Sequence, residues 1–393
     1  MITYLIVKLI GKCNLGCNYC YYMNDLANDF RTRIALETAV HMYERFSAYA
    51  RAMSLPTVAF SWHGGEPTLV GKEFFQNLLE EQRRHFDPDI RVNNQIQTNG
   101  TLVDEQWAEL FSIHNFSVGV SIDGSPENHD RNRYYHNKNG SYDRVVQCIN
   151  LLRSYGVRFG TITVIDPSLN GSDVFDHHYR LGIRKMDFNL PIVPYANFLK
   201  QHGLTGASAF AKFMRDVLDA WLEKDDPEVE IRNLVSLMRL IIGASPIHCH
   251  STNQCDRYLT IESNGDVGLC ENLRVIDKRN SQIIPIGGLS EIYNTRMNVN
   301  KHTFFEIESA IRDKFNKYHF NKRGDICNAC DVKDVCNSGC PVHRFREGEG
   351  FQNPSFFCEY YKLLIGHISQ RLNREFSYCI PGSQPMVSGK TTT

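Results

Sequence analysis

Residues 2–20 read ITYLIVKLIGKCNLGCNYC. The stretch begins with an apolar run, from Ile2 to Ile10, and continues directly into three cysteines, Cys13, Cys17 and Cys20. A structural zinc site closes with four ligands, whereas a 4Fe-4S cluster held by three thiolates leaves one iron open to another ligand. The stretch therefore predicts a β-strand that leads into an open iron–sulfur site.

The composition limits the partners that the chain can have. Its 393 residues include 43 basic and 44 acidic ones, a net charge of −1, which provides no field to attract nucleic acid or an anionic membrane. No apolar stretch reaches about 18 residues, and the first apolar run is interrupted by Lys8 and lacks a cleavage site. The 13 cysteines are clustered in a large chain, which favours metal ligation over disulfides. We expect a cytoplasmic protein without nucleic-acid or membrane partners.

The first part of the chain alternates β-type runs with helical patterns such as Ala35–Ala48 and Asp143–Arg153, as parallel sheets built from βα units do. Six units predict an α/β fold with a partial (β/α)6 barrel, similar to an incomplete TIM barrel. The predicted strands are Tyr4–Leu9, Thr57–Trp62, Arg91–Thr98, Phe116–Ile122, Arg158–Ile165 and Lys185–Leu190.

Polar or ligand-type residues follow four of these strands. Cys13 follows the first, Gly64-Gly65-Glu66 the second and Asn99 the third, while Ser121 closes the fourth. In barrel folds the loops after the strands carry the ligand-binding groups, because the strands fix their positions. We therefore expect these residues to line one site.

The chain divides into three predicted parts. Residues 1–235 form the barrel, and residues 236–375 form a cysteine-rich domain that folds around metal, reached through a helical bridge between Ser208 and Gly243. Residues 376–393 are polar and are expected to be a disordered tail.

The C-x3-C-x2-C spacing, with Tyr19 before the last cysteine, resembles the signature of the radical S-adenosylmethionine (SAM) enzyme superfamily. A partial zinc loop completed by a distant ligand is the alternative. The resemblance implies that the open iron binds SAM, whose reductive cleavage gives a 5'-deoxyadenosyl radical. It also implies adenine contact for Tyr19 and ribose contacts for Gln97 and Asn99, although for these two an ordinary loop position is an equal alternative.

The same resemblance implies which residues hold the methionine end of SAM. Gly64-Gly65-Glu66 resembles the family's GGE motif, in which backbone carbonyls and a carboxylate reach the ammonium group. Ser121 and either Arg131 or Arg133 resemble the positions that bind the carboxylate, for which a guanidinium fork is suited, and we favour Arg133.

A second cysteine pattern occupies the C-terminal part of the chain. Its spacing, C-x9-G-x4-C and then C-x2-C-x5-C-x3-C-x17-C, resembles that of the SPASM domain, and Cys249 adds an eighth thiol. Eight thiols suffice for two fully ligated auxiliary 4Fe-4S clusters, while a pair of zinc ribbons is the alternative. The resemblance assigns Cys249, Cys255, Cys270 and Cys340 to the first auxiliary cluster and Cys327, Cys330, Cys336 and Cys358 to the second.

The remaining cysteines and three histidines are explained without ligation. Cys148 lies at helix spacing among apolar residues, which predicts a small buried hydrophobe, and Cys379 begins the polar tail. His63, His248 and His250 flank proposed ligands and are expected to donate hydrogen bonds around them or to lie on the surface.

Glu271 directly follows Cys270, at the position where anaerobic sulfatase maturases carry a catalytic aspartate. A carboxylate there is suited to accept the proton released when a substrate radical is oxidised. A solvated glutamate or a salt-bridge partner is the alternative.

The resemblance spans residues 1 to about 370 and implies a peptide- or protein-modifying enzyme. We place first the oxidative crosslinking, of cyclophane or thioether type, of a ribosomally made precursor peptide, with electrons passing to the auxiliary clusters. The alternative is an anaerobic sulfatase maturase that oxidises Cys or Ser to formylglycine, and a third hypothesis is a non-catalytic metal-binding protein. Because the first strand starts near residue 3, we expect no peptide-recognition domain ahead of the barrel.

The expected cofactors are SAM and three 4Fe-4S clusters. The expected partners are the peptide or protein substrate and a low-potential electron donor such as flavodoxin or ferredoxin.

Overall fold

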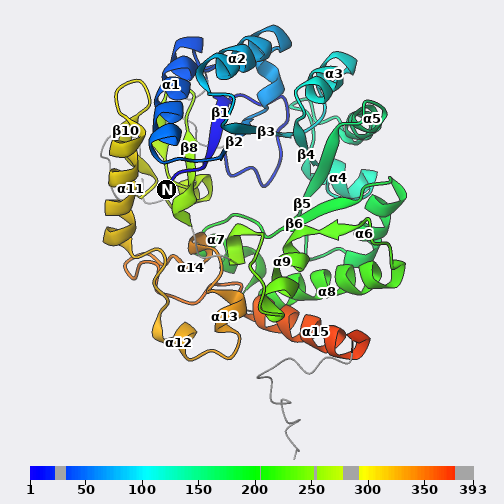
Figure 1. Ribbon diagram of the computed structural model, residues 1–393. Coiled ribbons are helices and arrows are strands. Elements are labelled where there is room, and N and C mark those ends of the chain that lie inside the picture. The colour runs from blue at the N-terminus through cyan, green and yellow to red at the C-terminus, as the bar shows by residue number, and fades with distance from the viewer. Residues whose placement is uncertain (23–31, 204, 252–254, 278–291, 377–393) are drawn as a thin grey trace, which may run out of the picture.

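The computed structural model describes residues 1–22, 32–203, 205–251, 255–277 and 292–376. Its strands form one sheet in the order β10-β9-β8-β1-β2-β3-β4-β5-β6-β7, which curves inside a layer of helices (Figure 1). Because β7 and β10 lie at opposite edges, the sheet is an open barrel. The strands are β1 (Tyr4–Ile10), β2 (Thr57–Gly64), β3 (Arg91–Thr98), β4 (Ser117–Ser121), β5 (Arg158–Val164), β6 (Lys185–Asn189), β7 (Glu230–Ile231), β8 (Tyr258–Ile261), β9 (Asp266–Gly268) and β10 (Asn294–Asn298).

Helices follow the strands of the barrel and cover its outer side, and a second set belongs to the C-terminal region (Figure 1). The α-helices are α1 (Leu36–Ala52), α2 (Lys72–His85), α3 (Glu105–Ile113), α4 (Pro126–Asn132), α5 (Tyr142–Ser154), α6 (Gly171–Arg180), α7 (Tyr195–His202), α8 (Ala207–Lys224), α9 (Arg232–Ile241), α10 (Arg274–Asp277), α11 (Phe304–Tyr318), α12 (Asp325–Asn328), α13 (Lys333–Cys336), α14 (Pro341–Arg344) and α15 (Cys358–Phe376).

The predicted α/β fold with a partial barrel is confirmed. The six predicted strands correspond to β1–β6, which pair in parallel in sequence order, and their ends differ by at most two residues. The predicted helical bridge between Ser208 and Gly243 consists of α8 and α9. They are separated at Asp225, whose φ of 47° is left-handed and ends α8.

The two faces of the barrel strands differ in chemistry. Phe60 and Trp62 of β2 stack at 5.7 Å on the outer face, beneath α1 and α2, and both are fully buried. The alternate residues face inward, where Ser61 and Gln95 line a cavity of about 210 Å³. Since successive side chains of a strand point to opposite faces, the apolar run of β1 also turns Lys8 into the barrel.

The C-terminal region continues the same sheet. β8 pairs in parallel with β1, from Tyr4 beside Tyr258 to Val7 beside Ile261, and β9 and β10 extend the edge in antiparallel fashion. The division at residue 235 therefore crosses a shared sheet, and it stays a prediction as a domain boundary. The predicted tail begins at Phe376, which is the last residue of α15. Residues 377–393, which include Cys379, lie outside the described residues.

An aromatic cluster joins the barrel to the last part of the chain. Phe198 of α7 and Phe210 of α8 lie 4.9 Å and 5.1 Å from the ring of Phe357, which is fully buried. His343 packs on the same ring at 4.8 Å. Aromatic pairs at these separations stabilise beyond their buried area, so the cluster fixes the C-terminal region against the barrel.

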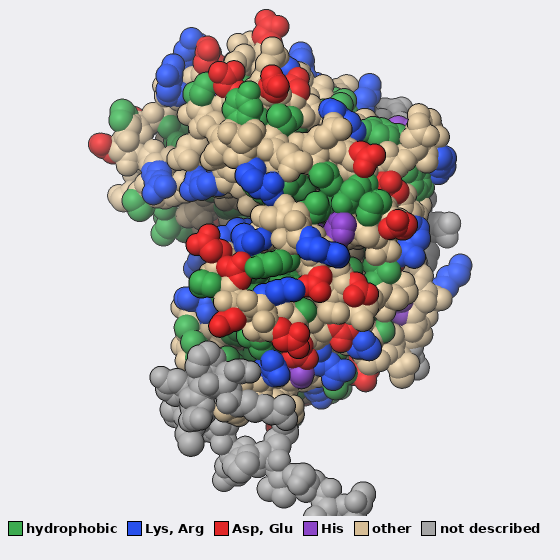
Figure 2. Space-filling view, turned by 90° about the vertical axis from the view of Figure 1, so that its right-hand side faces the viewer, with side chains coloured by type: hydrophobic (Ala, Val, Ile, Leu, Met, Phe, Trp, Pro, Cys, Tyr) green, Lys and Arg blue, Asp and Glu red, His purple; other side chains and the backbone are tan. Residues whose placement is uncertain are grey.

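The surface carries both signs of charge. Figure 2 shows acidic and basic side chains interspersed over one face of the molecule, in keeping with the net charge of −1. Among the described residues, no helix is both long enough and apolar enough to cross a membrane.

Candidate active site

A cavity of about 340 Å³ opens at the carboxyl ends of the barrel strands. It brings together loops from β1 to β6 with the segments around Cys249 and Glu271 of the C-terminal region. Every predicted SAM contact lines it, together with the three cysteines of the first motif. These residues are Cys13, Cys17, Tyr19, Cys20, Gly64, Gly65, Glu66, Gln97, Asn99, Ser121 and Arg133.

The loop that carries the first three cysteines is held by backbone hydrogen bonds to residues at the end of α4 and just after it. The N–H of Gly16 donates to the carbonyl of Tyr134 at 2.8 Å, and the N–H of Asn18 donates to Asn132 at 3.1 Å. Burial raises the pKa of the Cys13 thiol to about 12 and that of Cys17 to about 11, and the neighbouring thiols of the motif add to both shifts. A bound cation would favour the thiolates, as in a metal-binding donor set.

The GGE turn packs directly against the cysteine loop. The N–H of Gly65 donates to the carbonyl of Ile10 at 2.7 Å, and the N–H of Glu66 donates to Lys12 at 2.8 Å. A Cβ at Gly65 would overlap the carbonyl oxygen of Lys12, and one at Gly64 would overlap that of Ile10. Only glycine permits this approach, so the turn positions the three thiols as well as its own groups.

The carboxylate of Glu66 is anchored on the wall of the cavity. One oxygen accepts from the hydroxyls of Thr68 and Thr98 at 2.6 and 2.7 Å and from the N–H of Thr68 at 3.1 Å. The other accepts from the N–H of Asn99 at 2.7 Å, and among the described residues this is the one donor found for it. Burial raises the pKa of Glu66, and these donors oppose the rise. A carboxylate that lines the cavity and has an oxygen with only one donor can accept a further hydrogen bond from an ammonium ligand.

Arg133 and Arg131 have different surroundings. Arg133 is buried and forms a two-point contact with Asp123, at 2.8 Å from Nε and 3.3 Å from Nη2, and the hydroxyl of Tyr19 donates to the same carboxylate. Burial opposes the charge of Asp123, but Arg133 lowers the pKa of this carboxyl. Arg131 pairs with Asp166 at 2.6 Å near the surface and does not line the cavity. The geometry therefore favours Arg133 over Arg131.

The polar residues after β3 and β4 are linked in pairs. The side-chain amide of Gln97 donates to the hydroxyl of Ser121 at 3.1 Å. The amide of Asn99 donates to the side chain of Asn14 at 3.0 Å and lies 3.6 Å from the sulfur of Cys13. Asn99 therefore connects the third strand to the cysteine loop, a contact that sequence spacing does not reveal.

Glu271 lies on the floor of the cavity beside a buried cation. Its carboxylate forms an ion pair with the ammonium of Lys8, which also lies 3.2 Å from Nδ1 of His63. The Nε2 atom of His63 lies 3.7 Å from Glu271, and the hydroxyl of Tyr21 hydrogen-bonds it. Burial alone would raise the pKa of Glu271, but His63 and Lys8 hold it at about 2. The salt-bridge alternative for Glu271 is thus present, and its partner Lys8 was not identified from the sequence as a site residue.

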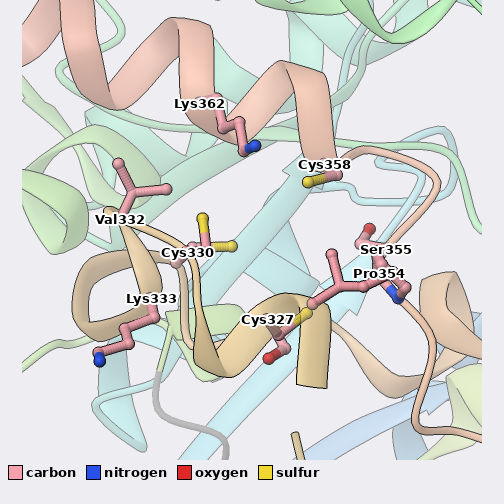
Figure 3. Close-up of a pocket in the computed structure, with 11 residues that line it drawn as sticks. Cys327, Cys330, Val332, Lys333, Pro354, Ser355, Cys358 and Lys362 are labelled. Carbon is pink, nitrogen blue, oxygen red and sulfur yellow. The ribbon is translucent and has the colours of Figure 1, made fainter. Parts of the chain in front are cut away.

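The eight C-terminal thiols fall into two groups. Cys249, Cys255, Cys270 and Cys340 interact electrostatically with one another, and burial raises the pKa of Cys249, Cys270 and Cys340 to about 12. The second group lines a small cavity near the surface, toward which Cys327, Cys330 and Cys358 point, with Lys362 of α15 beside them (Figure 3). The members of this group are Cys327, Cys330, Cys336 and Cys358.

These donor sets fit clusters by their chemistry. In the part of the chain that the structure describes, no three His, Cys, Asp or Glu side chains are close enough together to hold a single metal ion. A 4Fe-4S cubane is instead ligated by thiolates at separate iron corners. Three thiols on an open cavity beside an anchored carboxylate fit a cluster that keeps one iron for a ligand.

Two further expectations concern the remaining cysteine, Cys148, and two histidines, His248 and His250. Cys148 is fully buried in α5, as predicted, with its sulfur against Gly100. His248 and His250 both line the cavity, where their rings lie 4.6 Å apart, and Nε2 of His248 lies 3.6 Å from Asp187. They are interior groups rather than surface groups.

Comparison with known proteins gives consistent matches. Residues 7–178 match the family model of the Radical SAM superfamily. The chain is 29% identical over 369 residues to a cysteine-type anaerobic sulfatase-maturating enzyme of Clostridium novyi, covering 92% of this chain and 93% of that protein. A serine-type enzyme of Bacteroides thetaiotaomicron is 28% identical over 396 residues, with 93% and 89% covered. A solved structure described as native anSMEcpe with bound AdoMet and Cp18Cys peptide is 25% identical, with a TM-score of 0.79 and 95% and 98% covered.

Proposed function

The chain is a radical SAM enzyme, and on that premise we propose that it is a maturase that oxidises a cysteine or serine side chain of a protein substrate to formylglycine. The observation that carries the proposal is the near full-length similarity to both cysteine-type and serine-type sulfatase-maturating enzymes. These relatives support the alternative drawn from the sequence better than the peptide crosslinking that we placed first. The hypothesis of a non-catalytic metal-binding protein is set aside.

Cys13, Cys17 and Cys20 are proposed to hold the first cluster. When bound, SAM and this cluster supply a 5'-deoxyadenosyl radical, which removes a hydrogen atom from the substrate side chain. The residues of the chain then have positioning roles. Glu66 and the carbonyls of Gly64 and Gly65 are proposed to hold the ammonium group of SAM.

The carboxylate end and the nucleoside of SAM are proposed to contact further residues of the same cavity. Arg133 is held in place by Asp123, so its guanidinium is oriented before any ligand binds, which lowers the entropy lost on binding. Ser121 is proposed to contact the same carboxylate, Asn99 the ribose and Tyr19 the adenine. Each assignment is supported by the position of the residue on the one cavity.

Oxidation of the substrate radical releases one electron and one proton, which leaves an aldehyde from serine or a thioaldehyde from cysteine, and water converts the latter to the aldehyde with release of hydrogen sulfide. Glu271 is proposed to accept the proton, because it lines the same cavity as the SAM contacts and its carboxylate, paired with Lys8, is ionised. The two groups of C-terminal thiols are proposed to hold two auxiliary 4Fe-4S clusters that take the electron. A flavodoxin or ferredoxin as electron donor and the cytoplasmic location stay predictions.

The test uses the anaerobically reconstituted full chain with dithionite, SAM and peptides that carry a sulfatase motif with Cys, Ser or Ala at the target position. We expect 5'-deoxyadenosine and a mass loss of about 18 Da for Cys, or about 2 Da for Ser, with an aldehyde that reacts with hydrazine reagents. The Ala peptide is the control and keeps its mass. A loss of about 2 Da without an aldehyde would instead favour crosslinking.

A further inference from the structure

Arg344, the last residue of α14, is a buried cation that has no carboxylate partner among the described residues. Its side chain has no exposed surface. Nη1 donates to the carbonyl of Lys322 at 3.1 Å, and Nη2 donates to that of Phe320. Nε has no hydrogen-bond partner, and Arg344 has no ion pair within the described ranges of the chain.

Such a position is costly for a guanidinium. Burying an unpaired charge is unfavourable, and two carbonyl dipoles offset only part of the desolvation cost. Burial lowers the pKa of Arg344 accordingly, and the titratable groups that most favour its charge are four thiols. Cys255 and Cys340 belong to the first C-terminal group, and Cys327 and Cys336 belong to the second. Arg344 is therefore within electrostatic reach of both groups at once.

We propose that Arg344 is the shared counter-charge of the two auxiliary iron–sulfur sites and sets the reduction potential of both. The inference rests on the proposed auxiliary clusters. A cluster ligated by four thiolates carries net negative charge, which increases by one when the cluster is reduced. A buried cation nearby stabilises the reduced form more than the oxidised form, so it raises the potential.

The chain offers a matched control two residues away. Arg346 is partly buried, and its guanidinium lies 3.5 Å from the ring centre of Tyr195. The groups that favour its charge are Tyr195 and Glu349, with no cysteine among them. Replacing Arg346 thus removes one positive charge from the same segment but leaves the charge near the thiols unchanged.

The experiment uses the full chain with Cys13→Ala, Cys17→Ala and Cys20→Ala, so that only the C-terminal thiols bind iron. In this parent we compare Arg344→Gln, Arg344→Lys and Arg346→Gln after anaerobic reconstitution. Gln keeps a donor for the main-chain carbonyls but loses the charge, whereas Lys keeps the charge. The readouts are iron and sulfide per chain and a redox titration followed by EPR.

We expect about eight irons in the parent, and more negative midpoint potentials for both clusters in Arg344→Gln, with Arg344→Lys and Arg346→Gln close to the parent. If only the Arg344→Gln variant loses iron while its circular dichroism spectrum stays like that of the parent, the result supports the same role. Parent-like potentials in Arg344→Gln overturn the inference, and so do equal shifts in Arg344→Gln and Arg344→Lys, which indicate a purely geometric role. A parent that binds no iron overturns the auxiliary clusters themselves and this inference with them.

Discussion

The ammonium of Lys8 and the carboxylate of Glu271 form an ion pair between the first strand of the barrel and the C-terminal region. Lys8 has no exposed surface, and the side chain of Glu271 is 12% exposed. The pair therefore connects the floor of the cavity to the segment that directly follows Cys270. Because both side chains are largely buried, a charge here that loses its partner has little access to water.

We expect Lys8→Met to destabilise the protein by about 3 to 5 kcal/mol, because it leaves the largely buried carboxylate of Glu271 without its ammonium partner. The measurement is the free energy of unfolding by urea at pH 7. Lys72→Met is the control, since Lys72 pairs with Asp104 at 2.7 Å on the surface, where such a pair contributes about 1 kcal/mol or less. Equal effects of the two substitutions would contradict the importance of burial.

Gly65→Ala tests how the GGE turn positions the cysteine loop. The added Cβ would overlap the carbonyl of Lys12, so the loop must move away from the turn. We expect the variant to form no 5'-deoxyadenosine and to bind about four fewer irons than the wild type after reconstitution. Gly366→Ala in α15 is the control, because a Cβ there meets no atom within 4 Å and alanine favours a helix. Wild-type SAM cleavage in Gly65→Ala would refute this role of the turn.

The sequence predicts the barrel and the grouping of residues on one cavity better than it predicts their partners. The six strands follow from local alternation, and the loops after parallel strands meet at one end, so Cys13 and Glu66 could be placed together. The pairing of Lys8 with Glu271 joins residues 263 positions apart and leaves no periodic signal. The only sequence cue was a lysine inside an apolar strand. Similarly, β8 beside β1 depends on a long-range contact that no local pattern encodes.

Phe357→Ala tests the aromatic cluster between the barrel and the C-terminal region. Phe357 is fully buried against Phe198, Phe210 and His343, so we expect a loss of about 3 to 5 kcal/mol in the free energy of unfolding. Phe305→Ala is the control, because the side chain of Phe305 is 47% exposed and leaves a smaller cavity. A similar loss for both substitutions would indicate that the cluster does not hold the two parts together.

His129 makes the stability of the barrel sensitive to acid. It is fully buried, its Nδ1 accepts from the N–H of Asp123 at 3.3 Å, and Nε2 lies 2.9 Å from the hydroxyl of Ser141. Burial, together with the nearby charge of Arg133, lowers the pKa of His129 from 6.5 to about 3. In the unfolded chain His129 gains a proton as the pH falls through about 6.5, whereas in the folded chain it stays neutral down to about 3.

Between these two values the unfolded state binds more protons, so stability that is present above about pH 6.5 is lost as the pH falls. At pH 5 the loss amounts to about 2 kcal/mol. From pH 7 to pH 5, we expect the free energy of unfolding of His129→Asn to fall by about 2 kcal/mol less than that of the wild type. This difference does not depend on the stability of the variant at pH 7. His319→Asn is the control, because His319 lies at an exposed left-handed position that asparagine tolerates. Its free energy of unfolding should fall between pH 7 and pH 5 by as much as that of the wild type. An unchanged pH dependence in His129→Asn would mean that the folded protein admits a proton at this site near neutral pH.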